Sequence, residues 1–502
     1  MSKFFFLSIL FNCWVSLAIA QVDSTTFCMP CDSLLKLNLP DVKMLTVETR
    51  EKPVPHCRLN GIIGKEINFE LVLPEDWNGR FSMSGNGGFA GSIQTGHPRL
   101  RLGFANVATD TGHKGEGNDG SWAYLHPERQ VNFGHLAVHL TTVTAKAIVE
   151  QYYCQAPAYS YFVGCSRGGG QAMMEAQRYP EEFDGIIAGA PAFDWTHLAA
   201  EFVQNTQAIF PNPSTNQQPI ITDANLALLQ EAVLTQCDTK DGINDGILND
   251  PRDCPFDFEQ LPLCPEGTAS KDCFTSKQLE SIKKVYEGVS VDQQPFYAGF
   301  PLGCESEPRG WKSWITGTTN NPENPYEGSL QRALGVDVFR YFIFHDPEWS
   351  HTKYDFTGYE DKVQFTAATL DASSTDYSQF IESGGKMIMY HGWNDPCLSA
   401  LSTVQHYEKA MANNPRLDDH IRLFMMPGVL HCNGGPGPSH TDWLKAIMDW
   451  VENDQAPDQM ILTKRKKGKT VLERPTFPYP AKAVYDGKGD PSKASSFYKS
   501  ND

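Results

Sequence analysis

Short apolar runs alternate with segments of helical periodicity over the first part of the chain. Apolar residues at helical spacing predict helices over Leu136–Tyr153 and Ala172–Tyr179. Compact apolar runs bounded by turn residues predict strands at Phe69–Leu73, Phe81–Ser84, Tyr159–Val163 and Ile186–Ala188. Because such alternation is typical of parallel strands joined by crossover helices, we predict an α/β fold.

The pattern changes at about residue 197, where the chain becomes rich in cysteine, proline, glycine and aromatic residues. This composition, with scattered helices such as Ser276–Glu287, favours an inserted lid over residues 197–380. The alternation returns with strand-like runs at Lys386–Tyr390 and Arg422–Met426, separated by a helix over about Ala400–Ala412. We therefore expect the core to comprise residues 21–196 and 381–502, with an irregular surface tail from about residue 462.

The first twenty residues have the pattern of a signal peptide. Lys3 precedes the apolar run Phe4–Leu17, and Ala18-Ile19-Ala20 forms a small-x-small cleavage signal. A membrane anchor is the alternative, but the apolar run is too short to span a bilayer. We expect a secreted protein, extracellular or periplasmic, whose mature chain begins at Gln21.

Composition restricts the class of partner. The 502-residue chain has 40% hydrophobic residues, which suits a globular protein with a sizeable core. Its formal net charge of -18 argues against nucleic acid and anionic membranes as partners. The one short basic run, Lys464–Lys467, is interpreted as a solvated loop rather than a binding patch.

Cysteine content agrees with export. The chain has 13 cysteines, and removal of Cys13 with the signal peptide leaves 12. An even number in a secreted chain predicts a disulfide framework. Spacing suggests the local pairs Cys237 with Cys254 and Cys264 with Cys273, and it leaves open the pairing of Cys28, Cys31, Cys57, Cys154, Cys304 and Cys397.

A G-x-S-x-G motif lies between a predicted strand and a predicted helix. In Gly164-Cys165-Ser166-Arg167-Gly168, a tight turn would lift the serine hydroxyl clear of the sheet. The backbone N–H of Arg167, at the start of the following helix, would help to hold an oxyanion. Ser166 is therefore the candidate nucleophile, and a glycine-rich turn without chemistry is the alternative.

A serine nucleophile needs a base and an acid that orients the base. In this type of fold the order along the chain is serine, acid, histidine. Asp395 follows the predicted strand Lys386–Tyr390, and His431 follows Arg422–Met426, so both have the expected positions. We predict that Ser166, Asp395 and His431 form a catalytic triad.

Cysteines flank both the candidate nucleophile and the candidate base. Cys165 precedes Ser166, and Cys432 follows His431. A disulfide between them would hold nucleophile and base together, and such positioning is a substantial part of catalysis.

With these residues the chain resembles the tannase and feruloyl esterase family, which has the same Cys-Ser, Asp and His-Cys arrangement with that disulfide. The resemblance covers nearly the whole mature chain and includes the stretches Gly85–Phe89, Ala108–His113 and Tyr179–Ala192. It implies an α/β-hydrolase core with a large inserted lid. It also implies a second oxyanion donor in the backbone of Gly87 or Gly88, and a substrate that is a small aromatic acyl ester: hydroxycinnamoyl, galloyl or terephthaloyl.

An aspartate-rich loop lies in the predicted lid. Asp238, Asp241 and Asp245 recur at short spacing between glycines, as suits a hard cation with oxygen ligands, or equally a solvated turn. The loop resembles the family's calcium loop. That resemblance implies a structural Ca²⁺ held by these three side chains and by the carbonyl groups of Ile243 and Ile247.

The chain departs from the family pattern in two places. The pattern's terminal cysteine pair is missing: Phe477 takes one position, and no cysteine lies near residues 497–499. Arg167 and the run Gly168-Gly169-Gly170 also differ from the commoner members. Without the cysteine pair, we do not expect a disulfide to anchor the tail. Because of the changes at residues 167–170, the substrate preference of the commoner members does not carry over in detail to this chain.

Lid aromatics either line an aryl pocket or form the core of the lid. The residues in question are Trp311, Trp314, Phe339, Tyr341, Phe342 and Phe344. Arg340, beside them, either meets a substrate carboxylate or lies at the surface. The predicted function is a serine carboxylic-ester hydrolase, and the alternatives are a serine peptidase of the same fold and a non-catalytic, calcium-dependent binding protein.

Overall fold

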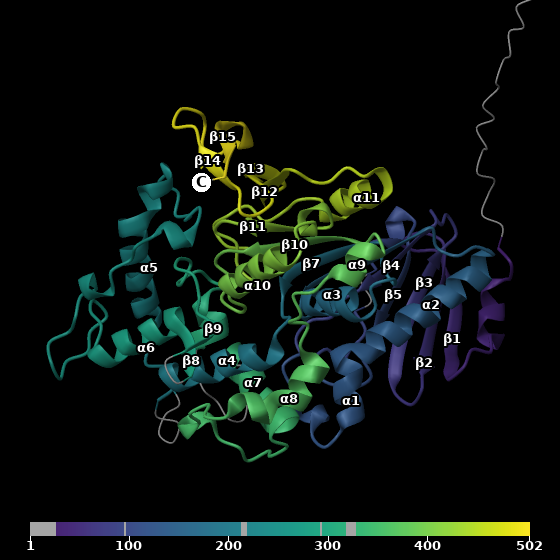
Figure 1. Ribbon diagram of the computed structural model, residues 1–502, viewed down its shortest axis with the longest axis horizontal. Coiled ribbons are helices and arrows are strands. Elements are labelled where there is room, and N and C mark those ends of the chain that lie inside the picture. The colour runs from purple at the N-terminus through teal and green to yellow at the C-terminus, as the bar shows by residue number, and fades with distance from the viewer. Residues whose placement is uncertain (1–26, 95–96, 212–217, 292–293, 318–327, 502) are drawn as a thin grey trace, which may run out of the picture.

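The computed structural model describes residues 27–94, 97–211, 218–291, 294–317 and 328–501 (Figure 1). The predicted signal peptide, residues 1–20, and the expected new N-terminus at Gln21 lie outside this part of the chain. No helix of the described residues is both long and apolar enough to cross a membrane.

Nine strands of the described residues form one central sheet in the order β1-β2-β3-β5-β4-β6-β7-β10-β11. The pairs β1–β2, β2–β3 and β3–β5 are antiparallel, and every pair from β5 to β11 is parallel. The strands are β1 Val42–Arg50, β2 His56–Ile63, β3 Ile67–Pro74, β4 Arg80–Ser84, β5 Ala105–Thr109, β6 Tyr159–Ser166, β7 Gly185–Pro191, β10 Lys386–Gly392 and β11 Ile421–Met426. The predicted α/β fold is confirmed.

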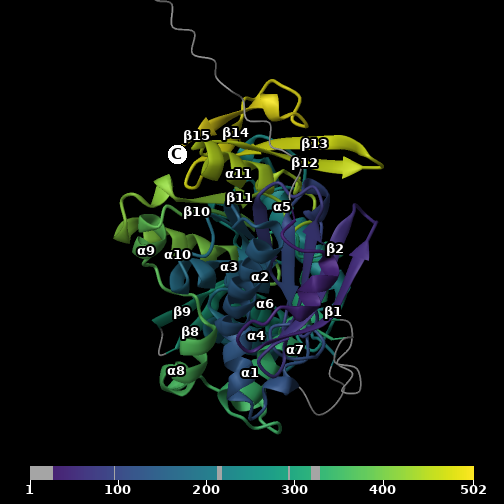
Figure 2. The same ribbon diagram turned by 90° about the vertical axis from the view of Figure 1, so that its right-hand side faces the viewer.

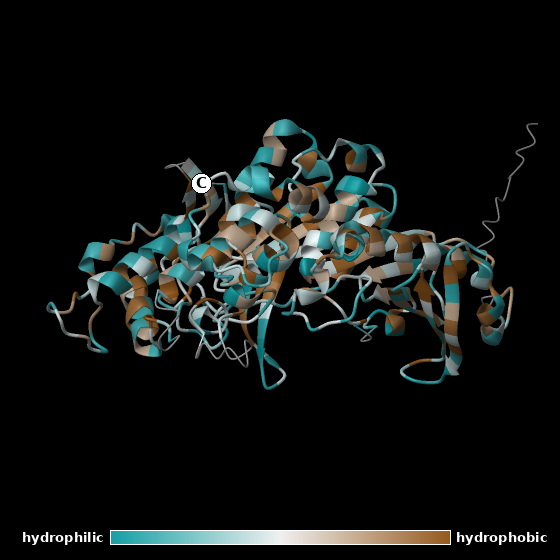
Figure 3. Cartoon of the chain, turned by 90° about the horizontal axis from the view of Figure 1, so that it is seen from below, coloured by the Kyte–Doolittle hydropathy of each residue, from teal (hydrophilic) through white to brown (hydrophobic). Residues whose placement is uncertain are grey.

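Helices cover both faces of the sheet, and neighbouring residues of a strand contribute to opposite faces. Phe162 and Ile186 pack in the core formed with α2, α3 and α10, whereas Tyr161 and Ile187 pack in the core formed with α11. These helices are α2 Ala137–Tyr153, α3 Arg167–Arg178, α10 Ala400–Asn413 and α11 Trp443–Asn453, with the short α1 Pro127–Val131 and α9 Ser378–Glu382 beside them. Figure 3 shows hydrophobic residues gathered along the strands.

The lid is the chain between β7 and β10, drawn in teal and green to one side of the sheet in Figure 1. One apolar core, around Leu229, lies within the lid, and a second, around Phe339, is shared with Phe89, Trp122 and Phe133 from the first part of the chain. Capping boxes at Thr222 and Thr275 start α5 and α6, so these helices begin where the sequence supplies a side-chain cap. Its elements are α4 Trp195–Ile209, α5 Asp223–Cys237, α6 Ser276–Glu287, β8 Gly288–Val291, β9 Gln294–Ala298, α7 Leu330–Asp337 and α8 Tyr359–Leu370.

The C-terminal segment is not the irregular tail that the sequence predicted. β12 (Met460–Lys466) pairs with β13 (Lys469–Thr476), and β14 (Lys482–Tyr485) pairs with β15 (Phe497–Ser500). Figure 2 shows these strands, in yellow, as a separate layer beyond β11 and α11.

The prediction failed because the charged residues occur in runs, Lys464–Lys466 in β12 and Glu473-Arg474 in β13, so these short strands show no period-2 alternation of apolar and polar residues. Leu462 and Arg474 are fully buried. The basic run Lys464–Lys467 forms the end of β12 and the turn after it rather than a loop; Arg465, Lys466 and Lys467 are exposed to solvent as expected, and Lys464 donates to two carbonyl groups. Phe477, at the position of the missing cysteine, is itself buried.

Among the described cysteines, ten form the five disulfides Cys28–Cys154, Cys31–Cys57, Cys165–Cys432, Cys237–Cys254 and Cys264–Cys273. The remaining two, Cys304 and Cys397, are buried free thiols. The even number of cysteines therefore did not mean that all of them pair, because pairing requires Cα atoms within about 7 Å and suitably directed side chains.

Candidate active site

The turn between β6 and α3 presents Ser166. Ser166 ends the strand and Arg167 begins the helix. The serine has φ of 64°, a backbone conformation that is strained for any residue other than glycine. A Cβ added to Gly164 would lie 2.3 Å from the carbonyl oxygen of Gly168, so strand and helix approach as closely as glycine allows. This is the geometry that the G-x-S-x-G motif predicted.

The glycines that follow bring α3 directly against the next strand. A Cβ on Gly169 would lie 2.2 Å from the oxygen of Gly189, and one on Gly170 would lie 2.0 Å from that of Ala192. The triple glycine that departs from the commoner pattern is therefore required by backbone packing beneath the serine.

Ser166, His431 and Asp395 form one connected chain of hydrogen bonds. Nε2 of His431 lies 2.8 Å from Oγ of Ser166, and Nδ1 of His431 lies 2.7 Å from Oδ2 of Asp395. Asp395 follows β10 and His431 follows β11, so the carboxyl ends of parallel strands bring these residues to one edge of the sheet. His431 and Asp395 are buried, whereas Ser166 is partly exposed.

Asp395 is more extensively hydrogen-bonded than the sequence indicated. Its Oδ1 accepts from the backbone N–H groups of Cys397 and Leu398, at 2.8 and 3.0 Å. Its Oδ2 lies near a second imidazole, with Nε2 of His391 at 3.2 Å. Burial raises the pKa of this carboxyl group, but the charge and hydrogen bond of His431 and the hydrogen bond of His391 outweigh burial and hold the pKa below its usual range.

The disulfide Cys165–Cys432 joins the residue before the serine to the residue after the histidine, with Cα atoms 6.1 Å apart. It crosses 267 residues of sequence and connects the ends of β6 and of the loop after β11. The candidate nucleophile and base are thus linked covalently as well as by their hydrogen bond.

Backbone N–H groups are available beside Ser166. Arg167 is the first residue of α3, where N–H groups have no partner within the helix. In the glycine-rich loop, the N–H of Asn86 donates to Gln171 and that of Phe89 donates to Gly117, which leaves Gly87 and Gly88 between them. Gly88 lines the same pocket as Ser166 and has φ of 51°.

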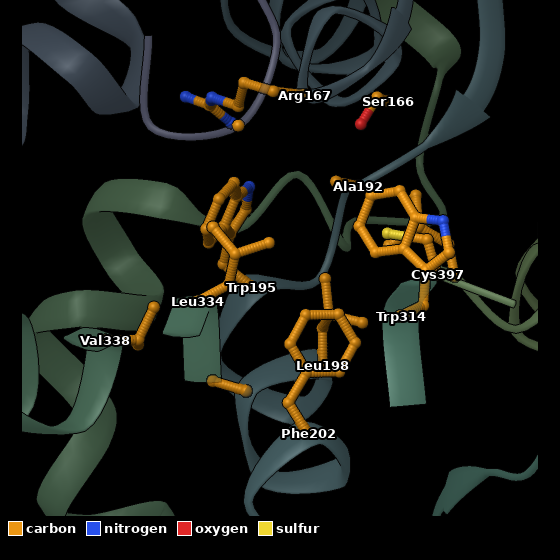
Figure 4. A pocket seen from close by; sticks show the side chains of 13 residues that line it. Ser166, Arg167, Ala192, Trp195, Leu198, Phe202, Trp314, Leu334, Val338 and Cys397 are labelled. Atoms are coloured by element: carbon orange, nitrogen blue, oxygen red, sulfur yellow. The ribbon is translucent and has the colours of Figure 1, made fainter. Parts of the chain in front are cut away.

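A pocket with mostly apolar walls opens at Ser166 (Figure 4). One face of α4 supplies Trp195, Leu198, Ala199 and Phe202, which are neighbours at helical spacing. Trp314 lies edge-on to the ring of His431, with ring centroids 4.9 Å apart. The residues that line the pocket, besides Ser166, are Gly88, Arg167, Ala192, Trp195, Leu198, Ala199, Phe202, Trp314, Leu334, Val338, Cys397 and Leu398.

Most of the lid aromatics considered from the sequence lie elsewhere. Trp314 lines the pocket, but Trp311 is buried in the core around α5 and α6. The other core of the lid contains or contacts Phe339, Tyr341, Phe342 and Phe344. Arg340 donates to the carbonyl oxygen of Trp349 and does not line the pocket. The apolar residues of α4 recur at helical spacing, but that pattern marks any buried helix face, so no sequence signal distinguished the pocket wall from the rest of the lid core.

The side chain of Arg167 is buried beside the serine. Its Nη2 donates to the carbonyl oxygens of Phe133 and Gly134, and its guanidinium lies 4.3 Å from the centroid of the Phe133 ring. Burial lowers the pKa of Arg167 to about 9. The carbonyls belong to the π-helical turn Asn132–Leu136, whose wider hydrogen-bonding pattern disturbs the regular helix, so Arg167 ties that turn to α3.

The aspartate-rich loop follows α5 and is held by its own carboxylates. Asp238 accepts from the N–H of Gly246, Asp241 from that of Ile243, and Asp245 from that of Ile247. Asp245 also pairs with the buried Arg474 at 2.8 Å. Oδ2 of Asp241 is buried without a hydrogen-bond partner, and burial raises the pKa of Asp241 to about 6. Carboxylate oxygens, including the unsatisfied Oδ2 of Asp241, are ligands of the type that Ca²⁺ prefers, but those of Asp238, Asp241 and Asp245 do not all lie within 4.8 Å of one another in the described structure.

Known proteins resemble this chain over most of its length. The family model described as tannase and feruloyl esterase matches residues 53–500. Mono(2-hydroxyethyl) terephthalate hydrolase from Piscinibacter sakaiensis is 34% identical over 88% of this chain and 84% of that protein. A probable feruloyl esterase B-1 from Aspergillus flavus is 30% identical over 85% of this chain and 82% of that protein.

Solved structures agree with the sequence relatives. Feruloyl esterase B from Aspergillus oryzae superposes with a TM-score of 0.81 at 25% identity, covering 94% of this chain and 99% of that one. Tannin acyl hydrolase from Aspergillus niger shares the fold, with a TM-score of 0.72 at 20% identity over 93% of this chain and 94% of that one. The chain therefore belongs to the tannase and feruloyl esterase family and is a carboxylic ester hydrolase.

Proposed function

We propose that this protein is a secreted serine esterase that cleaves aromatic acyl esters through an acyl-enzyme on Ser166. One observation carries the proposal: an unbroken hydrogen-bond chain from Ser166 through His431 to Asp395 begins at the mouth of an apolar pocket. A triad supplies the nucleophile, and the pocket supplies space for the acyl group.

The reaction follows from the positions of the donors and acceptors. Nε2 of His431 takes the hydroxyl proton as Ser166 attacks the ester carbonyl, and Asp395 stabilises the resulting imidazolium. The N–H groups of Arg167 and of Gly87 or Gly88 donate to the oxyanion, with Gly88 favoured by its place in the pocket wall. The alcohol leaves with the proton from His431, and water then attacks the acyl-enzyme with the same histidine as base.

The wall of the pocket supports an aromatic acyl group. Trp195, Phe202 and Trp314 offer flat apolar surface, and aromatic rings pack well against such side chains. Relatives named as a feruloyl esterase and as a mono(2-hydroxyethyl) terephthalate hydrolase point the same way. We propose hydroxycinnamoyl, galloyl or terephthaloyl esters as the substrate class.

The decisive experiment replaces the nucleophile and surveys substrates. Ser166→Ala should abolish hydrolysis of methyl ferulate, methyl gallate and a terephthalate monoester while the thermal midpoint of unfolding stays close to that of the wild type. Hydrolysis of these esters by the Ser166→Ala variant at the wild-type rate would exclude the mechanism.

The alternatives are tested in the same preparation. A serine peptidase would cleave a peptide panel in preference to the esters. A non-catalytic, calcium-dependent binding protein would leave Ser166 unlabelled by a fluorophosphonate probe, whereas the proposed enzyme is labelled at that residue.

Secretion is supported by the disulfides, because such bonds form and persist in oxidising compartments. We propose export followed by cleavage before Gln21. N-terminal sequencing of protein recovered outside the cytoplasm tests this directly, and a start other than Gln21 would contradict the cleavage site.

We further propose that the aspartate-rich loop binds a structural Ca²⁺ ion through Asp238, Asp241 and Asp245, with the carbonyls of Ile243 and Ile247. The cation would neutralise the carboxylates and stabilise this part of the lid. Treatment with EGTA should lower the thermal midpoint, and added Ca²⁺ should restore it. Asp241→Asn should remove this response, with Asp257→Asn outside the loop as the matched control; an unchanged midpoint in the wild type would exclude the site.

A further inference from the structure

A second histidine, outside the triad, contacts the carboxylate of Asp395. His391 is the penultimate residue of β10, is completely buried and precedes Asp395 by four positions. Nε2 of His391 lies 3.2 Å from Oδ2 of Asp395, the same oxygen that contacts His431. Nδ1 of His391 lies 2.9 Å from Oγ1 of Thr403, a buried residue of α10.

The two partners of His391 define its hydrogen-bonding state. An ionised carboxylate only accepts hydrogen bonds, so Nε2 of His391 must donate to Asp395. A neutral imidazole then has an acceptor at Nδ1, and the Thr403 hydroxyl can donate to it. Every polar atom of this buried group is thereby satisfied, which is the condition for burying an imidazole without a large cost.

With this contact Asp395 is held from several directions. Two backbone N–H groups fix Oδ1, and two imidazoles, one from β10 and one from the loop after β11, converge on Oδ2. The carboxylate can therefore neither rotate nor withdraw from His431 without breaking several hydrogen bonds. Because a triad loses much of its rate when the histidine is in the wrong orientation or tautomer, the fixation of its acid matters for catalysis.

We propose that His391 is a positioning residue: it fixes Asp395 Oδ2 against His431, and the hydrogen bond with Thr403 holds the imidazole of His391 in the orientation that allows it to do so. This inference rests on the proposed function, since it assigns a role relative to the proposed triad. In metal sites, hydrogen bonds that orient a ligand typically change activity by about 10-fold to 100-fold when they are removed, and we expect an effect at the lower end of that range here.

The groups around Asp395 also determine the effect of pH. They are His431 from the loop after β11, His391 from β10, the N–H groups of Cys397 and Leu398, and the buried Cys397 thiol. Loss of the His391 hydrogen bond should raise the pKa of Asp395 from its depressed value, because that bond favours the ionised form.

The test uses the full-length enzyme and two variants of different severity. Thr403→Val keeps the shape of the side chain but removes the hydroxyl, and His391→Asn removes the imidazole. We expect kcat to fall by on the order of 10-fold in both, with little change in KM for every ester that the enzyme accepts. Thr403→Ser restores the hydroxyl and should restore kcat.

The outcomes separate this inference from the proposed triad. Wild-type kcat in both Thr403→Val and His391→Asn, with Asp395→Asn inactive, would overturn the role of His391 alone. An active Asp395→Asn variant would instead overturn the proposed triad. If His391→Asn does not fold, Thr403→Val and its rescue by Thr403→Ser still decide the question, because a purely structural role would not couple the hydroxyl to kcat at an unchanged KM.

Discussion

The two sides of the candidate site are built differently. The reactive side uses short motifs at the ends of parallel strands, held by hydrogen bonds at Asp395, by close glycine contacts beneath Ser166 and by Cys165–Cys432. The acyl side uses one apolar face of α4 together with Leu334 and Val338, which belong to the lid. A substitution on the reactive side should therefore lower the rate of hydrolysis by the same factor for every ester. A substitution on the acyl side should change the rate by a factor that depends on the acyl group.

The largest expected effect is on the reactive side. Asp395→Asn should reduce kcat by about 10⁴-fold, because the histidine loses the acceptor that fixes its tautomer. KM should change little, and the ratio of rates between an aromatic and an acetyl ester should stay constant. Steady-state kinetics with the two esters checks this, and a variant with more than a tenth of wild-type kcat would contradict it.

A smaller effect is expected from the disulfide. Replacing Cys165 and Cys432 together by alanine should lower the free energy of unfolding by about 2–4 kcal/mol. It should also lower kcat by roughly 10-fold, because the serine and histidine lose a covalent constraint on their separation.

The matched control is the lid disulfide Cys264–Cys273, which spans 9 residues and does not line the pocket. Replacing both of its cysteines by alanine should cost stability without lowering kcat, as measured by denaturant unfolding and kinetics. Equal loss of kcat in the two double variants would show that the disulfide beside the triad has no special role.

The smallest effect tests the acyl side. Phe202→Leu should lower kcat/KM for an aromatic ester relative to an acetyl ester by about 10-fold, because one or two lost apolar contacts are worth about 1–3 kcal/mol. Phe339→Leu, in the core of the lid, should cost on the order of 1 kcal/mol of stability and leave the ratio unchanged. A ratio that moves equally in both variants would contradict the assignment of the wall.

The reactive side was the part that sequence reasoning could identify. Three features have a defined place along the chain: the G-x-S-x-G motif between a strand and a helix, an acid after one late strand, and a histidine after the next strand. Because the strands are parallel, all three lie at the same edge of the sheet. His391 escaped this reasoning because a histidine inside a strand has no distinctive pattern. Its role depends on a contact with Thr403, which lies on another element.

The wall of the pocket and the C-terminal strands needed the tertiary structure. Apolar residues of α4 and of the lid core look alike in sequence, and only packing decides which of Phe202 and Phe339 meets the pocket. Arg474 likewise gave no sign of being buried, because its pairing with Asp245 joins residues 229 positions apart.

The sequence by itself determined the alternation of strands and helices, the nucleophile turn and the order of serine, acid and histidine, because these depend on local conformation and on the direction of parallel strands. Only the tertiary structure decided how Cys28, Cys31, Cys57 and Cys154 pair while Cys304 and Cys397 stay free, which lid residues form the acyl wall and how Asp395 is held. Those features depend on distances between segments far apart in the chain, and local patterns carry no information about such distances.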